Sequence, residues 1–183
     1  MAQFYVGRRS LVIDIIPMKT EKEFANTLLD IITLRGAMDK LITDSARVEQ
    51  SRRVQDILRS LIIDHWYSEA EMQQQNFSEH RWQHFKHNVQ WYSSWRKVPG
   101  KFWLLLCKWI ADVMNLTSEK SLGWRVPLEV LEGLTKDISI LLNFLFWDKV
   151  FIKRYKSKTY SGQIGSDSYD RIPARFVGFA WDV

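Results

Sequence analysis

The sequence predicts a mixed α/β fold in which helices pack on a small sheet, followed by a small β-rich module. Two observations carry this prediction. The first half of the chain alternates apolar stretches of strand length with stretches of helical periodicity, in the order strand, strand, helix, strand. The segment 144–183 changes character and is rich in aromatic and β-branched residues, which is typical of strands. With 183 residues and 46% apolar content, the chain is long enough to bury one sizeable core.

The N-terminal segment predicts two strands that form a hairpin. The apolar stretches are QFYV and SLVIDII, residues 3–6 and 10–16, and the residues between them supply a short loop that contains Gly7. Because the first stretch begins almost at residue 1, the chain is expected to start inside a strand, as a truncated sequence would.

A helix is predicted next. Thr20 and Glu23 have the spacing of a capping box, and apolar residues then recur at helical spacing as far as Arg35, where Gly36 ends the helix. A buried strand, DKLIT, follows at 39–43. This strand runs directly into a loop, and the carboxyl ends of strands are where α/β sheets place their chemistry.

The middle of the chain predicts three more helices and one short strand. A helix is expected over 47–62 and a strand over 65–67, followed by a polar linker. The next helix begins after Asn76 and ends at Pro99 and Gly100, and a core helix is expected over 102–115. Four residues at steps of three and four are expected to pack the helix after Asn76 inward: Trp82, Phe85, Val89 and Tyr92.

The C-terminal part predicts a short helix in PLEVLEGL and two strands, LFWDKVFIKRY and ARFVGFAWDV. We therefore divide the chain into an α/β core over 1–120, a connecting helix and loop over 121–143, and a partial β module over 144–183.

Charge and cysteine content limit the possible partners. The formal net charge is +5 and the pI is near 9.3, which favours a polyanionic partner. Cys107 is the single cysteine and lies in an apolar run, so disulfides and a structural zinc site are not expected. The longest apolar run, 102–107, is too short to cross a bilayer, so we expect an intracellular protein without a membrane partner.

Five segments, in order along the chain, resemble the integrase region of copia-type long-terminal-repeat retrotransposon polyproteins. They are FYVGRRSLVIDIIPMK, LITDSARVE, QQQNFSE, FWLLLCKWIADVMNLT and LGWRVPLEVLEGLTKDISILLNFLFWDKVFIK. The resemblance implies an RNase H-like fold of the retroviral integrase type, a mixed sheet with packed helices that lacks its first strand here. It also implies that the segment after the core is an incomplete SH3-like module.

The resemblance assigns two catalytic metal ligands to this chain, Asp44 and Glu79. Integrases of this type are two-metal polynucleotidyl transferases, so it implies two Mg²⁺ or Mn²⁺ ions in each complete active site. The family's first aspartate, which bridges both metals, belongs to a strand that precedes Gln3. Because two carboxylates alone form at best a weak site, we expect this fragment alone to be inactive.

This chain departs from the family pattern near both ligands. The family's Asp-Asn-Gly is Asp44-Ser45-Ala46 here, which removes two turn-favouring residues. Thirty-four residues separate Asp44 from Glu79 (79 − 44 − 1), one fewer than is usual in the family. Asp14 aligns inside the second strand, where the family has no ligand, and we interpret it as a solvent-facing or edge-strand charge.

A simpler interpretation exists for each candidate ligand. Asp44 follows a strand and would serve equally as a polar cap at its end. Asn76 and Glu79 have the spacing of a capping box at the start of the helix, a role that is compatible with metal binding. His80 and His84 have a metal-ligand spacing, but the zincin pattern needs a glutamate where Arg81 stands, so we expect no zinc.

The helix that carries Glu79 is expected to meet DNA. Between His80 and Lys101 there are five lysines and arginines and no acidic residue, a pattern suited to phosphate contacts. A solvated basic helix face is the alternative. The predicted DNA contacts are Arg81, Gln83, Lys86, His87, Arg96 and Lys97.

By resemblance, the function is insertion of retroelement DNA into a host genome. The partners would be element ends, target DNA and further copies of the chain, with a cytoplasmic particle before integration and the nucleus at integration. The main alternative is a relic of such an element that binds DNA or protein without catalysis. An α/β protein with no role in nucleic-acid chemistry is a third hypothesis.

Overall fold

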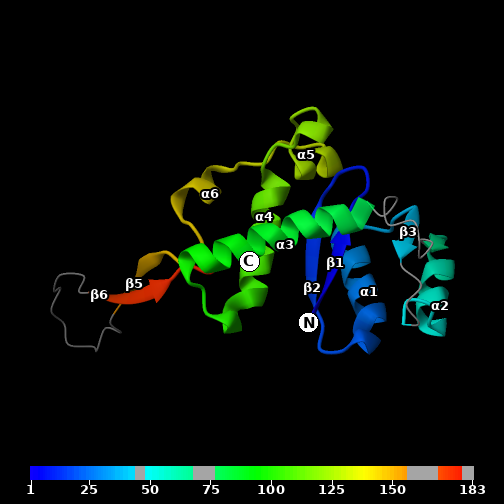
Figure 1. Ribbon diagram of the computed structural model, residues 1–183, viewed down its shortest axis with the longest axis horizontal. Helices are drawn as coiled ribbons and strands as arrows, with labels where there is room; N and C mark the ends of the chain where they lie inside the picture. Colours follow the sequence, from blue (N-terminus) through cyan, green and yellow to red (C-terminus); the bar gives the residue numbers. More distant parts are fainter. Residues whose placement is uncertain (44–47, 68–76, 156–168, 179–183) are drawn as a thin grey trace, which may run out of the picture. The chain divides into compact units, whose positions relative to one another are not determined.

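The computed structural model describes residues 1–43, 48–67, 77–155 and 169–178 (Figure 1). The chain forms two compact units, 1–136 and 137–183. The predicted connecting segment 121–143 is divided between these units, and the division into core, connector and β module stays a prediction. Among the described residues, no helix is long and apolar enough to cross a membrane.

The first unit begins with an antiparallel hairpin. Strand β1 (Ala2–Val6) pairs with β2 (Ile13–Pro17) along its whole length. The second strand starts later than predicted because the loop is longer. Gly7 N donates to Val12 O at 2.9 Å, and Leu11 has a left-handed φ of 63°, so the residues before Ile13 turn instead of extending.

Helices cover both faces of this hairpin (Figure 1). Consecutive side chains of a strand point to opposite faces, so the contacts of Phe4 and Tyr5 show which helix covers each face of the hairpin. The ring of Phe4 contacts Phe85 of α3 (Phe77–Arg96), with centroids 5.4 Å apart. Tyr5 stacks on Phe24 of α1 (Phe24–Arg35), and its hydroxyl is 2.9 Å from Thr27 Oγ1. Helices α3 and α1 therefore lie on opposite sides of the hairpin.

Helix α1 ends at Arg35 as predicted, but its start differs from a capping box. A short 3₁₀ turn, η1 (Glu21–Glu23), precedes it, and the Thr20 side chain makes no cap hydrogen bond. The Glu23 carboxylate reaches back one residue farther and accepts from Lys19 N at 2.9 Å. The tighter 3₁₀ turn explains the shift in this contact.

A second small sheet follows. Strand β3 (Lys40–Thr43) and β4 (Asp64–Tyr67) are parallel, and α2 (Arg52–Ser60) connects them. Helix α2 is shorter than predicted. One hydrophobic core joins this sheet to β2 and α1: Ile16, Phe24, Ala25, Leu28, Ile31, Leu41, Val54, Leu58 and Ile63. Because α1 supplies Phe24, Ala25, Leu28 and Ile31 to this core, it connects the two sheets.

Helices α3 and α4 (Trp103–Leu116) form the other layer. Phe85 and Tyr92 are buried as predicted, and the Tyr92 ring lies 4.9 Å from Trp109 of α4. Trp82 differs from the prediction because it is 41% exposed, although one edge contacts Phe4. A 3₁₀ turn, η3 (Gly100–Phe102), separates the two helices and follows the proline predicted to end α3.

Helix α4 also completes one edge of the hairpin. The buried Asn115 side chain accepts from Ile13 N and donates to Ile13 O, and both distances are 2.7 Å. These backbone groups face away from β1, so the amide takes the place of a neighbouring strand on β2.

The remaining elements are short. The first unit ends with η4 (Lys120–Leu122) and α5 (Pro127–Glu132), and α5 stops at Gly133 with φ 72°. The second unit contains α6 (Ser139–Asn143) and an antiparallel pair, β5 (Lys149–Tyr155) and β6 (Tyr169–Arg175). The predicted strand over 174–183 overlaps β6 at residues 174–175 and is wrong at 176–178, which form no strand, while 179–183 lie outside the described residues. The SH3-like assignment of this unit stays a prediction.

Candidate functional site

The two predicted metal ligands belong to element ends in the first unit. Asp44 directly follows β3, whose last residue is Thr43, but it lies outside the described residues. Helix α3 begins at Phe77, so Glu79 occupies its third position, as the sequence predicts. The proposed cap Asn76 also lies outside the described residues.

Glu79 is partly exposed at the start of α3. Among the described residues, its carboxylate has no hydrogen-bond or ion-pair partner. A carboxylate in the first turn is favoured by the positive end of the helix dipole and is an oxygen donor of the kind that Mg²⁺ prefers. The described residues contain no group of three or more acidic, histidine or cysteine side chains that could hold a metal. Glu79 therefore fits as one ligand of a site that needs further carboxylates.

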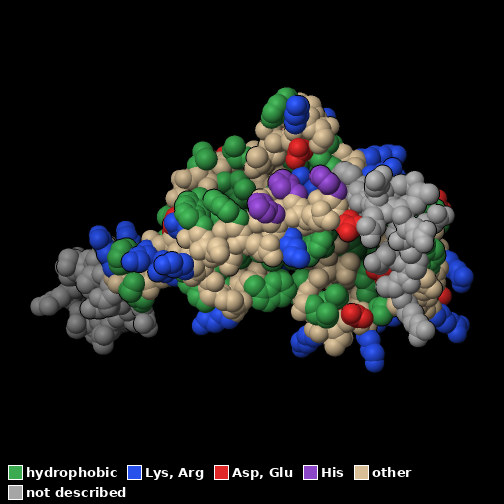
Figure 2. Space-filling model, in the orientation of Figure 1, with side chains coloured by type: hydrophobic (Ala, Val, Ile, Leu, Met, Phe, Trp, Pro, Cys, Tyr) green, Lys and Arg blue, Asp and Glu red, His purple; other side chains and the backbone are tan. Residues whose placement is uncertain are grey.

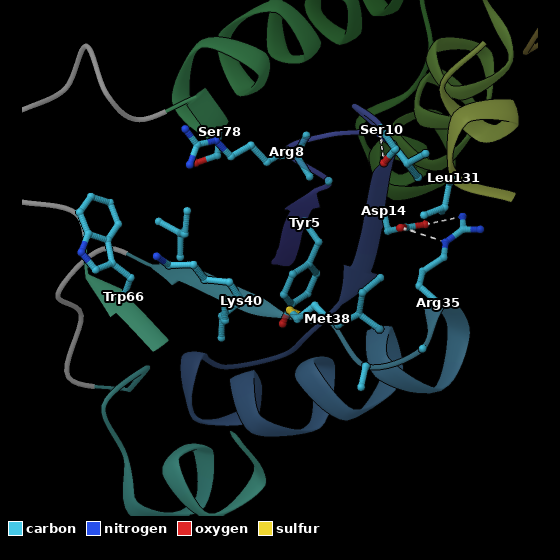
Figure 3. Close-up of a pocket in the computed structure, with 18 residues that line it drawn as sticks. Tyr5, Arg8, Ser10, Asp14, Arg35, Met38, Lys40, Trp66, Ser78 and Leu131 are labelled. Carbon is cyan, nitrogen blue, oxygen red and sulfur yellow. Dashed lines mark hydrogen bonds and ion pairs between the residues drawn. The ribbon is translucent and has the colours of Figure 1, made fainter. Parts of the chain in front are cut away.

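The ends of β3 and α3 share a pocket of about 640 Å³ (Figure 3). Ile42, two residues before Asp44, and Ser78, the neighbour of Glu79, both line it. The elements that carry the two predicted ligands therefore open on one pocket. Sequence spacing alone could not show this, because it depends on the packing of α3 against the sheet.

A polar network supports the end of β3 and was not predicted. Gln55 Nε2 donates to His65 Nδ1 at 3.0 Å and to the Tyr67 hydroxyl at 3.0 Å. Because Nδ1 accepts, Nε2 of His65 carries the proton and donates to Thr43 Oγ1 at 2.9 Å. Burial lowers the pKa of His65, which favours this neutral form. The network fixes Thr43, the residue before Asp44.

The Asp14 carboxylate is engaged in an ion pair with Arg35 instead of facing a candidate metal site. Its carboxylate accepts from Arg35 Nη2 at 2.8 Å and Nε at 3.2 Å, a bidentate pair. The Asp14 side chain is 14% exposed, so a solvent-facing charge is ruled out, whereas an edge-strand charge agrees with the structure because β2 pairs only with β1 among the described strands. The aspartate is an ion-pair partner that ties β2 to the end of α1.

Most predicted DNA contacts of α3 are accessible. Gln83, Lys86 and His87 are exposed along the helix, and Lys97 follows its last turn with a left-handed φ of 50°. Arg96 is half-buried, and its guanidinium lies over the Trp95 ring, 5.1 Å from the centroid. These side chains could reach a phosphate backbone without rearrangement of the helix.

Arg81 is placed differently from the others. It is 7% exposed, and Nη1 donates to the Glu119 carboxylate at 2.9 Å. Its Nε has no hydrogen-bond partner among the described residues. A buried guanidinium that is paired with a carboxylate is not accessible to a DNA phosphate, so we leave Arg81 out of the DNA surface proposed below.

The apolar periodicity of α3 marks only its inward face, so it did not predict two exposed tryptophans on this helix. The rings of Trp91 and Trp95 stack with centroids 5.3 Å apart and are 58% and 52% exposed. They follow the exposed His80, His84 and His87 along the helix, where histidines gather on the visible face (Figure 2). Exposed aromatic rings beside basic residues suit stacking with nucleic-acid bases.

Comparisons with known proteins identify the fold. No model of a protein family matches the chain, and no curated protein matches it. Among solved structures, the magnesium-bound HTLV-2 integrase catalytic core domain in its dimeric form is 15% identical, with TM-score 0.52 over 73% of this chain and 92% of that chain. The catalytic core domain of BIV integrase is 17% identical, with TM-score 0.55 over 70% of this chain and 82% of that chain.

A third similar structure is the simian T-cell lymphotropic virus intasome in complex with PP2A regulatory subunit B56 gamma. It is 16% identical, with TM-score 0.59 over 97% of this chain and 62% of that chain. At these identities the similarity concerns the fold. The mixed α/β architecture of this chain is the RNase H-like architecture of retroviral integrase catalytic cores.

Proposed function

We propose that the chain is the core portion of a copia-type retrotransposon integrase, a polynucleotidyl transferase that inserts element DNA into host DNA. The observation that carries the proposal is the shared pocket, which is lined by Ile42, two residues before Asp44 in the sequence, and by Ser78, the residue before Glu79. The integrase-type fold and the ordered sequence segments support it. The magnesium in the HTLV-2 core structures agrees with the metal that the resemblance implies.

Asp44 and Glu79 are the residues that would hold Mg²⁺ or Mn²⁺ in this account. Two such ions, when bound, activate the attacking oxygen and stabilise the leaving oxygen. The contribution of the chain itself would be to position these two carboxylates. The network of Gln55, His65 and Thr43 fixes the strand end before Asp44, and Glu79 lies in the first turn of α3, at the positive end of the helix dipole.

The exposed side of α3 is the proposed DNA surface. It comprises Gln83, Lys86, His87, Arg96 and Lys97, and the tryptophan pair Trp91 and Trp95 adds stacking surface along the same helix. DNA ends and target DNA are the proposed ligands. The HTLV-2 core has dimeric and trimeric forms, which supports the proposal that this chain works as a homo-oligomer, in a cytoplasmic particle and then in the nucleus.

Charge reversal on α3 tests the DNA surface. The double variant Lys86→Glu with Lys97→Glu is expected to weaken DNA binding and to reduce the slope of log K against log salt by about 2, because two phosphate contacts are lost. Fluorescence anisotropy with labelled duplex DNA over a salt series measures both quantities.

The matched control is Lys19→Glu with Lys22→Glu, which makes the same change in charge at exposed residues before α1. It is expected to change affinity much less. Equal losses of DNA affinity for the two double variants would show that the effect comes from net charge alone. DNA binding that does not depend on salt or on either variant would refute the proposed DNA surface.

A further inference from the structure

Exposed aromatic rings form a stripe along one face of α3. Its members are His80, His84, His87, Trp91 and Trp95, and they are named the aromatic stripe below. Each of these residues is exposed, and Figure 2 shows histidines gathered on the visible face. Successive members are three or four residues apart, so at 3.6 residues per turn they lie within about 80° of the helix circumference.

A buried cluster supports the tryptophan end of the aromatic stripe. The rings of Trp91 and Trp95 stack with centroids 5.3 Å apart and an interplanar angle of 21°. The buried Tyr92 ring meets Trp95 edge-on at 5.4 Å and lies 4.9 Å from Trp109 of α4. The guanidinium of Arg96 lies over the Trp95 ring. These contacts orient the exposed rings before a ligand binds, which lowers the entropy lost on binding.

Packing within the protein does not explain the aromatic stripe. An aromatic pair four residues apart stabilises a helix only slightly, and Trp91 and Trp95 remain 58% and 52% exposed. Indole rings that serve the core are covered to a much greater extent. The histidines of the stripe are also exposed, so they add little to the core. A continuous row of exposed rings is instead typical of a binding surface.

The charges around the aromatic stripe suit a polyanion. The segment 80–111 contains no aspartate or glutamate. The Glu119 carboxylate reaches this helix from another element, but it is paired with Arg81 at 2.9 Å. Gln83 and Gln90 lie beside the stripe and are exposed, and their amides can donate to and accept from the edges of bases. A strand of nucleic acid along the stripe would therefore meet rings and amides without repulsion from this segment.

The spacing of the rings selects an unpaired strand over a duplex. Neighbouring members of the aromatic stripe lie about 4.5 to 6 Å apart along the helix axis, and the stripe is about 22 Å long. Bases within a duplex follow one another at about 3.4 Å, and their faces cover one another. A single strand can open its stack to the wider spacing and lay its bases on the exposed rings, as histidine and tryptophan rings allow.

The aromatic stripe and the lysine of the proposed DNA surface lie on different faces of α3. Lys86 precedes Trp91 by five residues, which places it about 140° away around the helix. One nucleotide cannot contact both faces. Variants of the tryptophans and variants of the lysines therefore report on separate surfaces.

We propose that the aromatic stripe is a binding site for single-stranded DNA, whose unpaired bases stack on Trp91, Trp95 and the histidine rings. The inference rests on the proposed function and divides the DNA surface of α3 into a side for duplex and a side for single strands. A protein partner fits the stripe less well, because a dry interface would leave the ring nitrogens of three histidines in need of hydrogen-bond partners.

A comparison of two DNA probes tests the site on the full chain. The probes are labelled oligo(dT) of about eight nucleotides and a blunt hairpin duplex, and fluorescence anisotropy measures both affinities. Trp91→Ala with Trp95→Ala is expected to weaken oligo(dT) binding by about tenfold or more, because stacked bases are lost. The affinity for the duplex is expected to change by less than about twofold.

Matched variants separate stacking from other effects of the substitution. Trp91→Phe with Trp95→Phe retains aromatic rings and is expected to keep most of the affinity for oligo(dT). Trp124→Ala removes a tryptophan that is 68% exposed outside α3 and is expected to leave this affinity unchanged. An oligonucleotide in which abasic spacers replace the bases keeps the phosphates, and the unmodified chain is expected to bind it about tenfold more weakly or less tightly still.

The salt series distinguishes failure of this inference from failure of the proposed function. The double alanine variant is expected to keep the salt slope of the unmodified chain for oligo(dT), because no cation is removed. Unchanged oligo(dT) binding by that variant, with duplex binding still weakened by Lys86→Glu with Lys97→Glu, would overturn the aromatic stripe alone. Equal binding of the abasic probe and oligo(dT) would also overturn it.

Two further results would assign the aromatic stripe to another partner and overturn the proposal. The first is tighter binding of oligo(U) than of oligo(dT), which would indicate an RNA site. The second is a dimer of the unmodified chain that Trp91→Ala with Trp95→Ala converts to a monomer without a change in oligo(dT) affinity. Sedimentation velocity measures this oligomeric state.

Discussion

Asn115→Ala is expected to lower the free energy of unfolding by about 2 to 5 kcal/mol, because it leaves two buried backbone groups without partners. The Asn115 side chain bonds to Ile13 N and Ile13 O at 2.7 Å each and is 3% exposed. Alanine can replace neither bond. It also removes the contact that attaches α4 to the outer edge of β2.

Urea denaturation followed by circular dichroism measures this loss. Asn115→Asp is expected to cost at least as much as Asn115→Ala, because the carboxylate still accepts from Ile13 N but places a buried charge against Ile13 O. Asn88→Ala is the matched control. Asn88 is half-buried on α3, and its side-chain amide makes a weak contact with the sulfur of Met114 at 3.6 Å. A loss below about 1 kcal/mol for Asn115→Ala would show that Asn115 does not support the β2 edge.

The 183-residue chain is expected to show no strand-transfer activity, even with Mg²⁺ or Mn²⁺ and a matched DNA end. Two carboxylates, Asp44 and Glu79, lack the bridging aspartate that the resemblance assigns to a strand before Gln3. Without that bridge, a pair of divalent cations has too few oxygen ligands to stay at the separation that the chemistry needs. The expected effect is a complete loss of activity.

A gel assay that joins a labelled donor end to plasmid DNA measures this activity. The positive control is a longer chain that carries the family's first strand and its aspartate in front of residue 1. Activity is expected there, and Glu79→Gln in that chain is expected to abolish it. Robust joining of donor ends by the 183-residue chain alone would contradict the account.

Features that depend on local patterns were predictable from the sequence. The end of α1 at Arg35, the start of α3 after Asn76 and the extent of β3 all follow from capping residues, glycine and apolar periodicity. These signals act within a few residues. The position of Glu79 in the first turn of α3 was predictable for the same reason.

Features that depend on long-range packing were not predictable. Asn115 bonds to a residue 102 positions earlier, and Arg81 is buried by an ion pair with Glu119, 38 positions later. No sequence feature near Arg81 distinguishes it from Lys86, so both were predicted to contact DNA on the basis of their charge. The position of β6 also follows from its register with β5, which the aromatic composition of 174–183 does not contain.

Addition of Mn²⁺ to the ¹⁵N-labelled chain tests whether Asp44 and Glu79 form part of one cation site. Paramagnetic broadening of amide signals reports binding without any need for activity. The signals of Thr43 and Ser78 are expected to broaden first, and Glu79→Gln and Asp44→Asn are each expected to abolish this pattern. The control Asp39→Asn, at an exposed position before β3, should leave it intact. Uniform broadening, or a pattern that Glu79→Gln leaves unchanged, would contradict the account and favour a relic that binds DNA or protein without a metal site.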